Sequence, residues 1–502
     1  MESKVSRRLK EAIAPEVREY VFVPRLNREF HNNFVYLTSI NQAHLLMLHA
    51  TGLMDTATAA TLARALARME EEGPDAVELD AGREEAYFNY EARLMEIAGR
   101  DAGGRLHMAR SRNDMGATVD RMKTRAKILD LIDAMAAVHQ AAMARAREHA
   151  DAVMPGYTHL QPAQPITYGY YLTAVAETIL RDIDRLNLGL RRLDACPLGA
   201  GALAGTAFPI DRSATAAWLG FTAAVPNALD AVASRDFAWE LMSSVAIAAV
   251  TWSRVAQDYY VWSTPEFGLI EFPDSVASTS SIMPQKKNPA VLEHLKGKAA
   301  HMVGLLTASM ATIKGTNFTH TGDGSRESMR SFYEAVDEAK RCLALFRLIV
   351  DRAQPRRDAM LFQARTNFST ATDLADALVR EAGMSFRDAH HVVGAVVRRA
   401  LDAGIPADRI DAALIDAAAM EELGRPAGLE AGTVADCLDP ARNVAARKVM
   451  GGPAHARVLE SVERQEQARI RLLEEVSVLR RRLADADETL KRQTRELAAA
   501  GH

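Results

Sequence analysis

The sequence predicts an all-α fold built around an elongated bundle of long helices. Apolar residues recur at three- and four-residue steps over long stretches, and strand-like alternation is almost absent. Several of these stretches are rich in small apolar residues on more than one face, which is typical of helices buried on all sides. We therefore expect a helical bundle that packs against further copies of the chain.

The longest expected helix covers residues 114–150. No Gly or Pro interrupts residues 117–153, and a helix of this length spans about 50 Å at 1.5 Å per residue. Such a helix must bury its apolar face against neighbours of similar length. The apolar positions that follow the helical spacing are Met122, Leu129, Ile132, Met135 and Val138.

Four further stretches carry a comparable helical periodicity. One of them contains the segment 243–250, which reads Ser-Ser-Val-Ala-Ile-Ala-Ala-Val and is apolar all round. A helix of this kind is expected to be buried, here within an oligomer. The four stretches are residues 168–195, 228–262, 290–313 and 327–351.

The chain is expected to divide into four regions. The Gly103-Gly104 pair should end a helical N-terminal domain, and the remainder forms a central long-helix domain, a smaller helical domain and a helical extension. An apolar stripe in the extension predicts either a short coiled coil or an amphipathic helix lying on the body of the protein. The regions are residues 1–113, 114–355, 356–455 and 456–502; the stripe is Leu472, Val476, Leu479, Leu483, Ala486, Leu490 and Leu497.

Composition excludes several classes of protein. Of 502 residues, 48% are hydrophobic and 25% are charged, and the net charge of -4 provides no basic field for nucleic acid. Three cysteines lie far apart, which argues against a disulfide framework and a zinc site. The N-terminus lacks the apolar run of a secretory signal, and no apolar stretch is long enough to span a bilayer. We expect a cytoplasmic protein that has no membrane partner.

The most informative polar segment is residues 280–289. Ser280 and Ser281 begin it, Met283 follows, and Lys286, Lys287 and Asn288 add two ammonium groups and an amide. Adjacent lysines repel each other, so a chain tolerates this cluster mainly where an anion is held and a proton is moved. The alternative interpretation is a solvated polar loop.

Two other polar segments interrupt the long helices. In the first, Arg112 could clamp a carboxylate in a bidentate manner, Asn113 could orient it, and Asp114 is expected to cap the following helix. In the second, residues 156–165, His159 is the only group that titrates near neutral pH and could donate a proton to a leaving group. A structural role for this histidine is the alternative.

Two features superficially suggest cofactor or metal binding. The glycine-rich stretch 199–205 lacks both the GxGxxG spacing and a preceding strand, so no dinucleotide site is expected. His390, His391 and the other histidines show no metal-ligand spacing with acidic or thiol partners. We therefore expect neither a cofactor nor a metal.

Together the three polar segments resemble the aspartase/fumarase superfamily, and most closely its argininosuccinate lyase branch. Residues 280–289 look like the superfamily signature SSxMPxKxN, and residues 110–114 and 156–161 look like two other motifs of the branch. The likeness extends over roughly residues 80–460, with the motifs in the expected order. Further matches are residues 197–205, 230–237 and 451–458.

The resemblance implies a fold, an assembly and a reaction. The fold would be a three-domain helical fold that forms a homotetramer around a central bundle from all four subunits. Each active site would combine three motifs from three different chains. The reaction would be reversible β-elimination of an amine from a succinyl group, with release of fumarate.

The resemblance also assigns roles to residues. Ser280 would be the base that removes a proton, with Ser281 as the register alternative. Lys286 and Asn288 would stabilise the resulting aci-carboxylate. Thr158 and His159 would protonate the leaving side, and Glu293 would pair with His159. The remaining substrate contacts would come from Ser111, Arg112, Asn113, Gln161 and Met283.

The sequence departs from the branch where the arginine half of argininosuccinate is held. Three positions of the branch, a Tyr, a Gln and a Lys, correspond by eye to His320, Ser325 and Ser328. Near the N-terminus an aspartate and a serine are replaced, and the signature is altered at two flanking positions. These replacements are Leu37, Asn41, Thr279 and Ala290.

These departures predict a carbon–nitrogen lyase for another N-substituted aspartate. The closest activity that we can suggest in this branch is that of ethylenediamine-N,N'-disuccinate (EDDS) lyase. Argininosuccinate lyase is the alternative, and an inactive scaffold protein is the alternative from another class.

Overall fold

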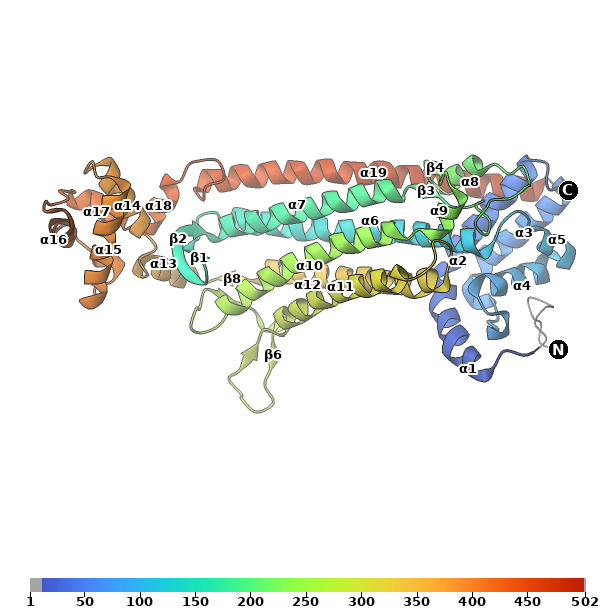
Figure 1. The fold of residues 1–502 in the computed structure, drawn as a ribbon, viewed down its shortest axis with the longest axis horizontal. Coiled ribbons are helices and arrows are strands. Elements are labelled where there is room, and N and C mark those ends of the chain that lie inside the picture. Colours follow the sequence, from blue (N-terminus) through green and yellow to red (C-terminus); the bar gives the residue numbers. More distant parts are fainter. Residues whose placement is uncertain (1–10, 501–502) are drawn as a thin grey trace.

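The computed structural model describes residues 11–500, and the chain is mostly helical, at 72%. The first ten residues, on which most of the N-terminal signal prediction rests, lie outside the described part. Figure 1 shows an elongated molecule in which long helices run side by side, with smaller groups of helices at its two ends. Within the described residues, no helix is long and apolar enough to cross a membrane.

Five long helices form the central bundle, and they bury one continuous apolar core. Trp252, Tyr259, Tyr168 and Phe332 are among its largest fully buried side chains. The predicted long helix is confirmed, and its 37 residues span about 55 Å. The helices are α6 (Arg112–Glu148), α7 (Tyr168–Leu193), α10 (Asp236–Trp262), α11 (Ala290–Lys314) and α12 (Met329–Arg352).

One of the expected helices is interrupted. The stretch 228–262 divides into α9 (Ala228–Ala233) and α10, because Ser234 and Arg235 leave the helical conformation. Arg235 is almost fully buried, and its guanidinium lies 3.4 Å from the carboxylate of Asp120 on α6. A buried charge needs such a partner, and the break allows this ion pair to form.

The helices of the N-terminal region gather at the end of the bundle where α6 begins (Figure 1). Gly103 and Gly104 lie in the last turn of α5, which ends at Arg105 and is the last helix before α6. A Cβ atom on Gly103 would lie 2.8 Å from the Cα of Met95, so this glycine permits close packing of α4 and α5. The elements are α1 (Pro15–Val17), a π-helical turn (Arg18–Phe22), α2 (Val23–Ala50), α3 (Thr56–Glu72), α4 (Ala86–Ala98) and α5 (Arg100–Arg105).

A separate group of helices with its own apolar core lies at the opposite end of the bundle (Figure 1). Leu374, Val396 and Ile415 are buried in this core. Its helices are α14 (Ala371–Arg380), α15 (Phe386–Asp402), α16 (Ala412–Leu423) and α17 (Ala431–Cys437), flanked by α13 (Arg357–Thr366) and α18 (Pro440–Ala446).

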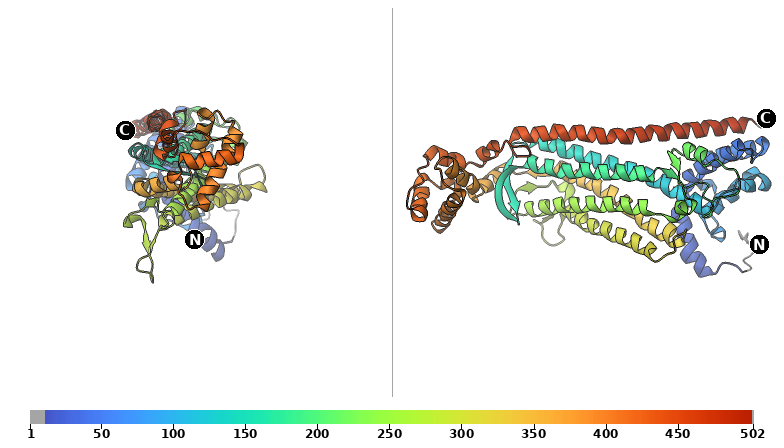
Figure 2. Two further views of the ribbon diagram at one scale, coloured as in Figure 1. Left: turned by 90° about the vertical axis from the view of Figure 1, so that its left-hand side faces the viewer. Right: turned by 45° about the horizontal axis from the view of Figure 1, so that its top comes forward.

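The C-terminal helix α19 (His455–Ala499) runs along the central bundle and on to the helices of the N-terminal region (Figures 1 and 2). Its apolar stripe faces the rest of the same chain, where Val476, Leu490 and Leu497 are buried in the bundle and N-terminal cores. The structure therefore favours the amphipathic helix on the body over the coiled coil, because the stripe is already covered.

The fold is not wholly helical, since four two-stranded sheets connect the helices in the described part of the chain. Two of these sheets carry segments that the sequence singled out, residues 156–165 and 280–289. The antiparallel pairs are β1 (Val153–Thr158) with β2 (Gln161–Thr167), β6 (Ser278–Thr279) with β7 (Lys287–Asn288), and β5 (Ile270–Glu271) with β8 (Gln354–Pro355); β3 (Ala195–Cys196) and β4 (Ala223–Ala224), on either side of α8 (Arg212–Trp218), are parallel.

The buried His139 on α6 should make the protein less stable in acid. Its side chain is fully buried, and this burial lowers its pKa from 6.5 to about 4. Between these values the unfolded chain takes up a proton that the folded chain does not, so the free energy of unfolding falls as pH falls from about 6.5 to 4, by up to about 1.4 kcal/mol per pH unit. His139→Leu should reduce this slope in urea unfolding, and an unchanged slope would contradict the prediction.

Candidate active site

The Arg112 segment lies where α6 begins. Ser111 caps the helix by accepting a hydrogen bond from the backbone N–H of Asn113 at 3.3 Å. The Arg112 guanidinium lies 4.7 Å from the centre of the Phe88 ring and 3.2 Å from the Glu85 carboxylate. These contacts hold Arg112 beside a cavity while leaving more than a third of its side chain exposed.

The buried Asp114 carboxylate bonds to the backbone of the Arg112 segment and of the glycine-rich loop, which refines its predicted capping role. It is the second member of a capping box in which Ser111 is the cap, and its first oxygen accepts the N–H of Ser111 at 2.9 Å. Its second oxygen accepts the N–H groups of Gly199 and Gly201 at 2.9 and 3.0 Å. The glycine-rich loop thus binds a carboxylate of the protein itself. Burial raises the pKa of Asp114 to about 6, and the backbone N–H groups oppose this shift.

We expect Asp114→Asn to destabilise the protein by about 3 kcal/mol, because an amide would present N–H groups to buried N–H donors. Urea unfolding measures this loss. Asp211 offers a matched control, since it caps α8 at an exposed site. Asp211→Asn should cost less than about 1 kcal/mol. Equal losses in the two variants would contradict the role of the buried carboxylate.

The second segment forms the tip of the β1–β2 hairpin. Thr158 pairs with Gln161, which leaves His159 and Leu160 as a two-residue turn with φ of 56° at both positions. This is the type I′ geometry, which normally selects Asn or Gly. Thr158, His159 and Gln161 are all exposed. A histidine held in this strained conformation at an exposed tip points to a functional rather than a packing role.

Because Asn suits a type I′ turn, His159→Asn should keep the hairpin and remove the proton donor. We expect kcat to fall by about 100-fold or more, with an unchanged or slightly higher melting temperature. Leu160→Asn is the control, because it relieves the same backbone strain at the neighbouring position of the turn. This variant should keep the kcat of the wild type. An active His159→Asn enzyme would remove His159 from the proton transfer.

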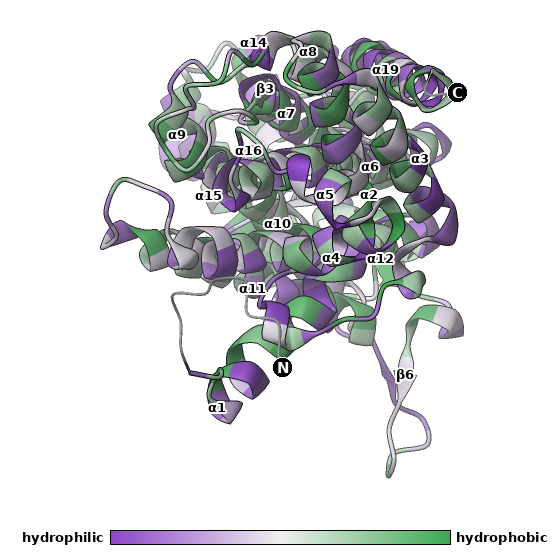
Figure 3. Cartoon of the chain, turned by 90° about the vertical axis from the view of Figure 1, so that its right-hand side faces the viewer, coloured by the Kyte–Doolittle hydropathy of each residue, from purple (hydrophilic) through white to green (hydrophobic). Residues whose placement is uncertain are grey.

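The Ser280 segment forms a loop that stands clear of the body, as the view along the bundle shows (Figure 3). Strands β6 and β7 form its stem, in which Thr279 pairs with Lys287. The Oγ of Ser280 accepts hydrogen bonds from the backbone N–H groups of Met283 at 3.1 Å and Ile282 at 3.4 Å. Such donors would stabilise a developing alkoxide. For Ser281 no comparable contact occurs among the described residues.

Within one chain the three segments lie far apart. Arg112 begins α6, and the His159 hairpin follows its other end, so roughly 55 Å of helix separates them. The loop of β6 projects from the body at a third place (Figure 1). The exposed Glu293 bonds to the hydroxyl of Tyr260 at 3.1 Å and does not contact His159 within the described chain.

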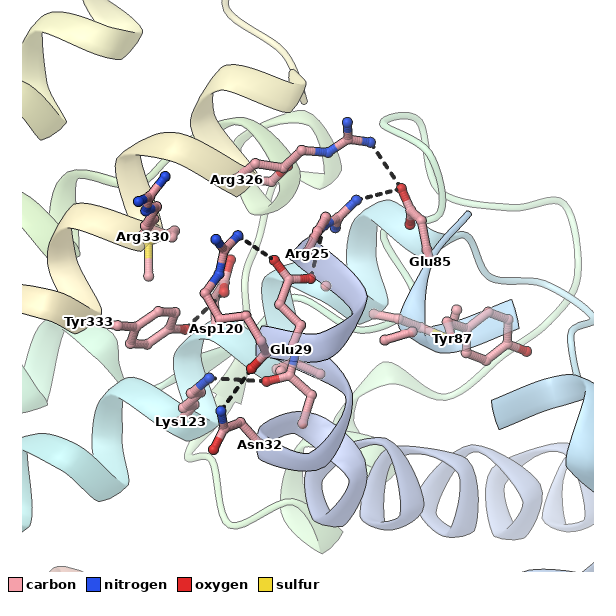
Figure 4. A pocket seen from close by; sticks show the side chains of 18 of the residues that line it. Arg25, Glu29, Asn32, Glu85, Tyr87, Asp120, Lys123, Arg326, Arg330 and Tyr333 are labelled. Carbon is pink, nitrogen blue, oxygen red and sulfur yellow. Dashed lines mark hydrogen bonds and ion pairs between the residues drawn. The ribbon is translucent and has the colours of Figure 1, made fainter. Parts of the chain in front are cut away.

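A cavity of about 540 Å³ adjoins Arg112 and Asn113. It lies between α2, the first turns of α6 and residues 320–337, and Figure 4 shows the charged side chains that line it. Burial alone would raise the pKa of Glu85, but the guanidinium groups of Arg25 and Arg112 outweigh it and hold this pKa below its ordinary value. Glu85 therefore remains a carboxylate in the cavity wall.

The positions at which the sequence differs from the argininosuccinate lyase branch fall into two groups, those that line the cavity and those that do not. Leu37, His320 and Ser325 line it. Asn41 is buried elsewhere and accepts a 2.5 Å hydrogen bond from Arg110, and the buried Ser328 bonds to Ser309 at 2.7 Å. Sequence reasoning missed Arg25, Glu85 and Arg326, which line the cavity. Only their contact in three dimensions distinguishes them from ordinary surface charges.

One metal-like cluster escaped the sequence analysis. His294, Glu338 and Cys342 place one possible ligand atom each within 4.8 Å of one another, although they come from two different helices. The Glu338 carboxylate lies 3.0 Å from the ammonium group of Lys298. A cation would have to displace this lysine, and we assign no metal to the cluster.

Five residues other than glycine have positive φ in the described chain, and four of them adjoin the candidate site. Glu84 precedes Glu85, Ala109 precedes the Arg112 segment, and His159 and Leu160 form the hairpin tip. Backbone strain of this kind concentrates at functional sites. Strained backbone therefore accompanies the cavity wall, the start of the Arg112 segment and the hairpin tip.

A long helical bundle with these three segments at its loops defines a lyase of the fumarase/aspartase type. A family profile described as "Lyase" matches residues 27–304, and a second, described as "Argininosuccinate lyase C-terminal", matches residues 368–445. The chain belongs to this lyase superfamily, in its argininosuccinate lyase branch.

Individual relatives agree with this assignment. Argininosuccinate lyase 1 of Shouchella clausii is 38% identical over 490 residues, which cover 98% of each chain. The argininosuccinate lyase of Methanothermobacter thermautotrophicus is also 38% identical, over 86% of this chain and 92% of its own. The crystal structure of EDDS lyase in complex with formate has a TM-score of 0.87 at 32% identity and covers 98% of this chain and 97% of its own.

Proposed function

We propose that the protein catalyses reversible β-elimination of an amine from an N-substituted aspartate. A base removes a proton from the carbon next to one carboxylate, and the pair of electrons delocalises into that carboxylate as an aci-carboxylate. The C–N bond then breaks, fumarate forms, and the departing amine takes up a proton. The observation that carries this proposal is the Ser280 Oγ, which accepts two backbone N–H groups in an exposed loop.

Ser280 is the proposed base because its environment lowers the cost of an alkoxide. The two backbone donors face its oxygen, and Lys286 contributes positive charge from the same loop. Lys286 and Asn288 would then stabilise the aci-carboxylate where its charge develops. The amide of Asn288 already donates to the backbone carbonyl of Thr279 at 3.4 Å, which orients it in the stem of the loop.

The active site is proposed to form between chains of a homotetramer. The three segments cannot meet within one chain, because α6 keeps Arg112 and His159 apart. Large apolar side chains also remain exposed along the bundle, which is typical of an interface. These are Ile247 and Val250 on α10, and Val303 and Met310 on α11.

In this assembly each segment handles one part of the substrate. Ser111, Arg112 and Asn113 would hold a carboxylate, and Gln161 and Met283 would complete its surroundings. Thr158 and His159 would face the leaving amine, and Glu293 from another chain would orient His159. No cofactor is needed for these steps, since each one moves a proton or breaks a bond that is activated by the carboxylate.

The preferred substrate is of the kind that ethylenediamine-N,N'-disuccinate lyase uses. The structure of that enzyme supports this choice through its likeness along the whole chain, as does a cavity wall of Leu37, His320 and Ser325. The alternative is argininosuccinate, which the names of the 38% identical relatives favour.

Fumarate absorbance tests the proposal directly. Purified protein is incubated in turn with ethylenediamine-N,N'-disuccinate and with argininosuccinate, and release of fumarate is followed over time. We expect faster release from the first compound. Faster release from argininosuccinate would support the alternative substrate, and the absence of fumarate from both and from other N-substituted aspartates would overturn the proposed reaction.

A further inference from the structure

Three guanidinium groups converge on a single carboxylate oxygen in the cavity, and Figure 4 shows two of them, Arg25 and Arg326, beside Glu85. The Oε1 atom of Glu85 lies 2.9 Å from Arg25, 3.0 Å from Arg326 and 3.2 Å from Arg112. Glu85 itself is mostly buried, with 15% of its side chain exposed. The three arginines come from α2, from the π-helical turn at Asp323–Ser328 and from the start of α6. Segments far apart in the sequence therefore build one cationic cluster.

The cavity as a whole has more positive than negative charge. Seven Lys or Arg side chains line it against five Asp or Glu side chains, an excess of two positive charges. His320 adds no charge at neutral pH, because burial lowers its pKa to about 4. An enclosed excess of positive charge favours an anionic ligand.

The Arg326 guanidinium has capacity for a further partner. It donates to Glu85 through Nη2, and its Nε and Nη1 atoms have no hydrogen-bond partner among the described residues. A guanidinium has five N–H donors in a planar fork that matches a carboxylate. One third of the Arg326 side chain is exposed, so its free edge is accessible from the cavity.

We propose that Arg326, supported by Arg25, binds a carboxylate carried by the amine half of the substrate, and that this contact determines which amine is accepted. This inference rests on the proposed function, in which Arg112 holds the succinyl half. Glu85 holds the guanidinium groups in place. Because Oε1 of Glu85 is already shared by three guanidinium groups, a cationic amine half would have to compete with them at this oxygen.

Three aspartates with different N-substituents test the proposal: 2-carboxyethyl, 2-aminoethyl and propyl. They have side arms of similar length that differ in charge. For the wild-type enzyme, we expect kcat/KM for fumarate release to be highest with the carboxyethyl compound. Arg326→Gln should lower this value by about 10- to 100-fold, as loss of a charge-assisted hydrogen bond does, and should leave the propyl compound within about threefold.

Two further variants make the result specific. Arg326→Glu should reverse the preference towards the aminoethyl compound, because the free edge becomes an acceptor for a cation. Arg347→Gln removes an arginine from the following helix, α12, outside the cavity, and should match the wild type. Melting temperatures of all variants identify any that fail to fold.

The outcomes separate the two hypotheses. Fumarate from all three compounds at similar rates, with no selective loss in Arg326→Gln, would overturn the inference and leave the proposed lyase reaction intact. The same holds if Arg326→Glu folds but does not shift the preference towards the aminoethyl compound. No fumarate from any N-substituted aspartate would overturn the proposed function, and with it this inference.

Discussion

Ser280→Ala is expected to lower fumarate release by about 1,000-fold while the protein remains folded, because loss of a general base costs about 100- to 10,000-fold. Ser280 lies in a loop that projects from the body, and within residues 11–500 its Oγ bonds only to backbone amides of the same loop. The free energy of unfolding should therefore change by less than about 0.5 kcal/mol. Initial rates measure fumarate release, size-exclusion chromatography shows whether the protein remains folded, and urea unfolding gives the free energy of unfolding.

Ser281→Ala is the matched control for this experiment. Ser281 is an exposed neighbour of the same size, and its oxygen has no backbone N–H donor to stabilise an alkoxide among the described residues. We expect it to retain most of the activity. The reverse result would assign the base to Ser281, and two fully active variants would exclude both serines.

A wild-type protein without any lyase activity would instead support the inactive scaffold. The structure gives this alternative little support. A scaffold has no need to keep His159 in a strained turn or to hold two backbone N–H groups on Ser280.

Helices were predictable where local spacing decides the structure. Apolar residues at helical steps located α6 because the same residues are buried, most of them in the bundle core and Met122 in the core of the N-terminal region. The prediction failed where a distant partner decides. Arg235, within the expected helix 228–262, breaks that helix to reach Asp120 on α6. This partner is not recognisable from the neighbouring sequence.

The same limit applies to the candidate site. Its three segments are local runs of unusual composition, so the sequence revealed them. The cavity wall depends on Arg25 and Glu85, which resemble ordinary surface charges until α2 and α4 pack together. The turn at Asp323–Ser328 is π-helical and adds residues to one turn. Consequently Arg326 faces the cavity. Ser328, which the sequence analysis matched to a substrate-binding position of the branch, is buried.

Two inactive variants should restore activity when they are mixed, because the proposed site combines segments from different chains. Arg112→Gln removes the carboxylate clamp, and Ser280→Ala removes the base. If the two residues at each site come from different chains, some sites of a hybrid oligomer contain both intact. Random assembly gives both residues at about a quarter of the sites. Refolding the two variants together, and measuring fumarate release against each variant refolded alone, tests this expectation.

A pair of variants in one segment provides the control. Arg112 and Asn113 are adjacent at the start of α6, so they reach every site from the same chain. Mixing Arg112→Gln with Asn113→Ala should therefore restore nothing beyond the sum of the two. Mass spectrometry of the intact oligomers would show that hybrids form. Hybrids of Arg112→Gln and Ser280→Ala without recovered activity would mean that one chain supplies both residues. The Ser280 loop would then have to fold back to the end of the bundle where Arg112 lies.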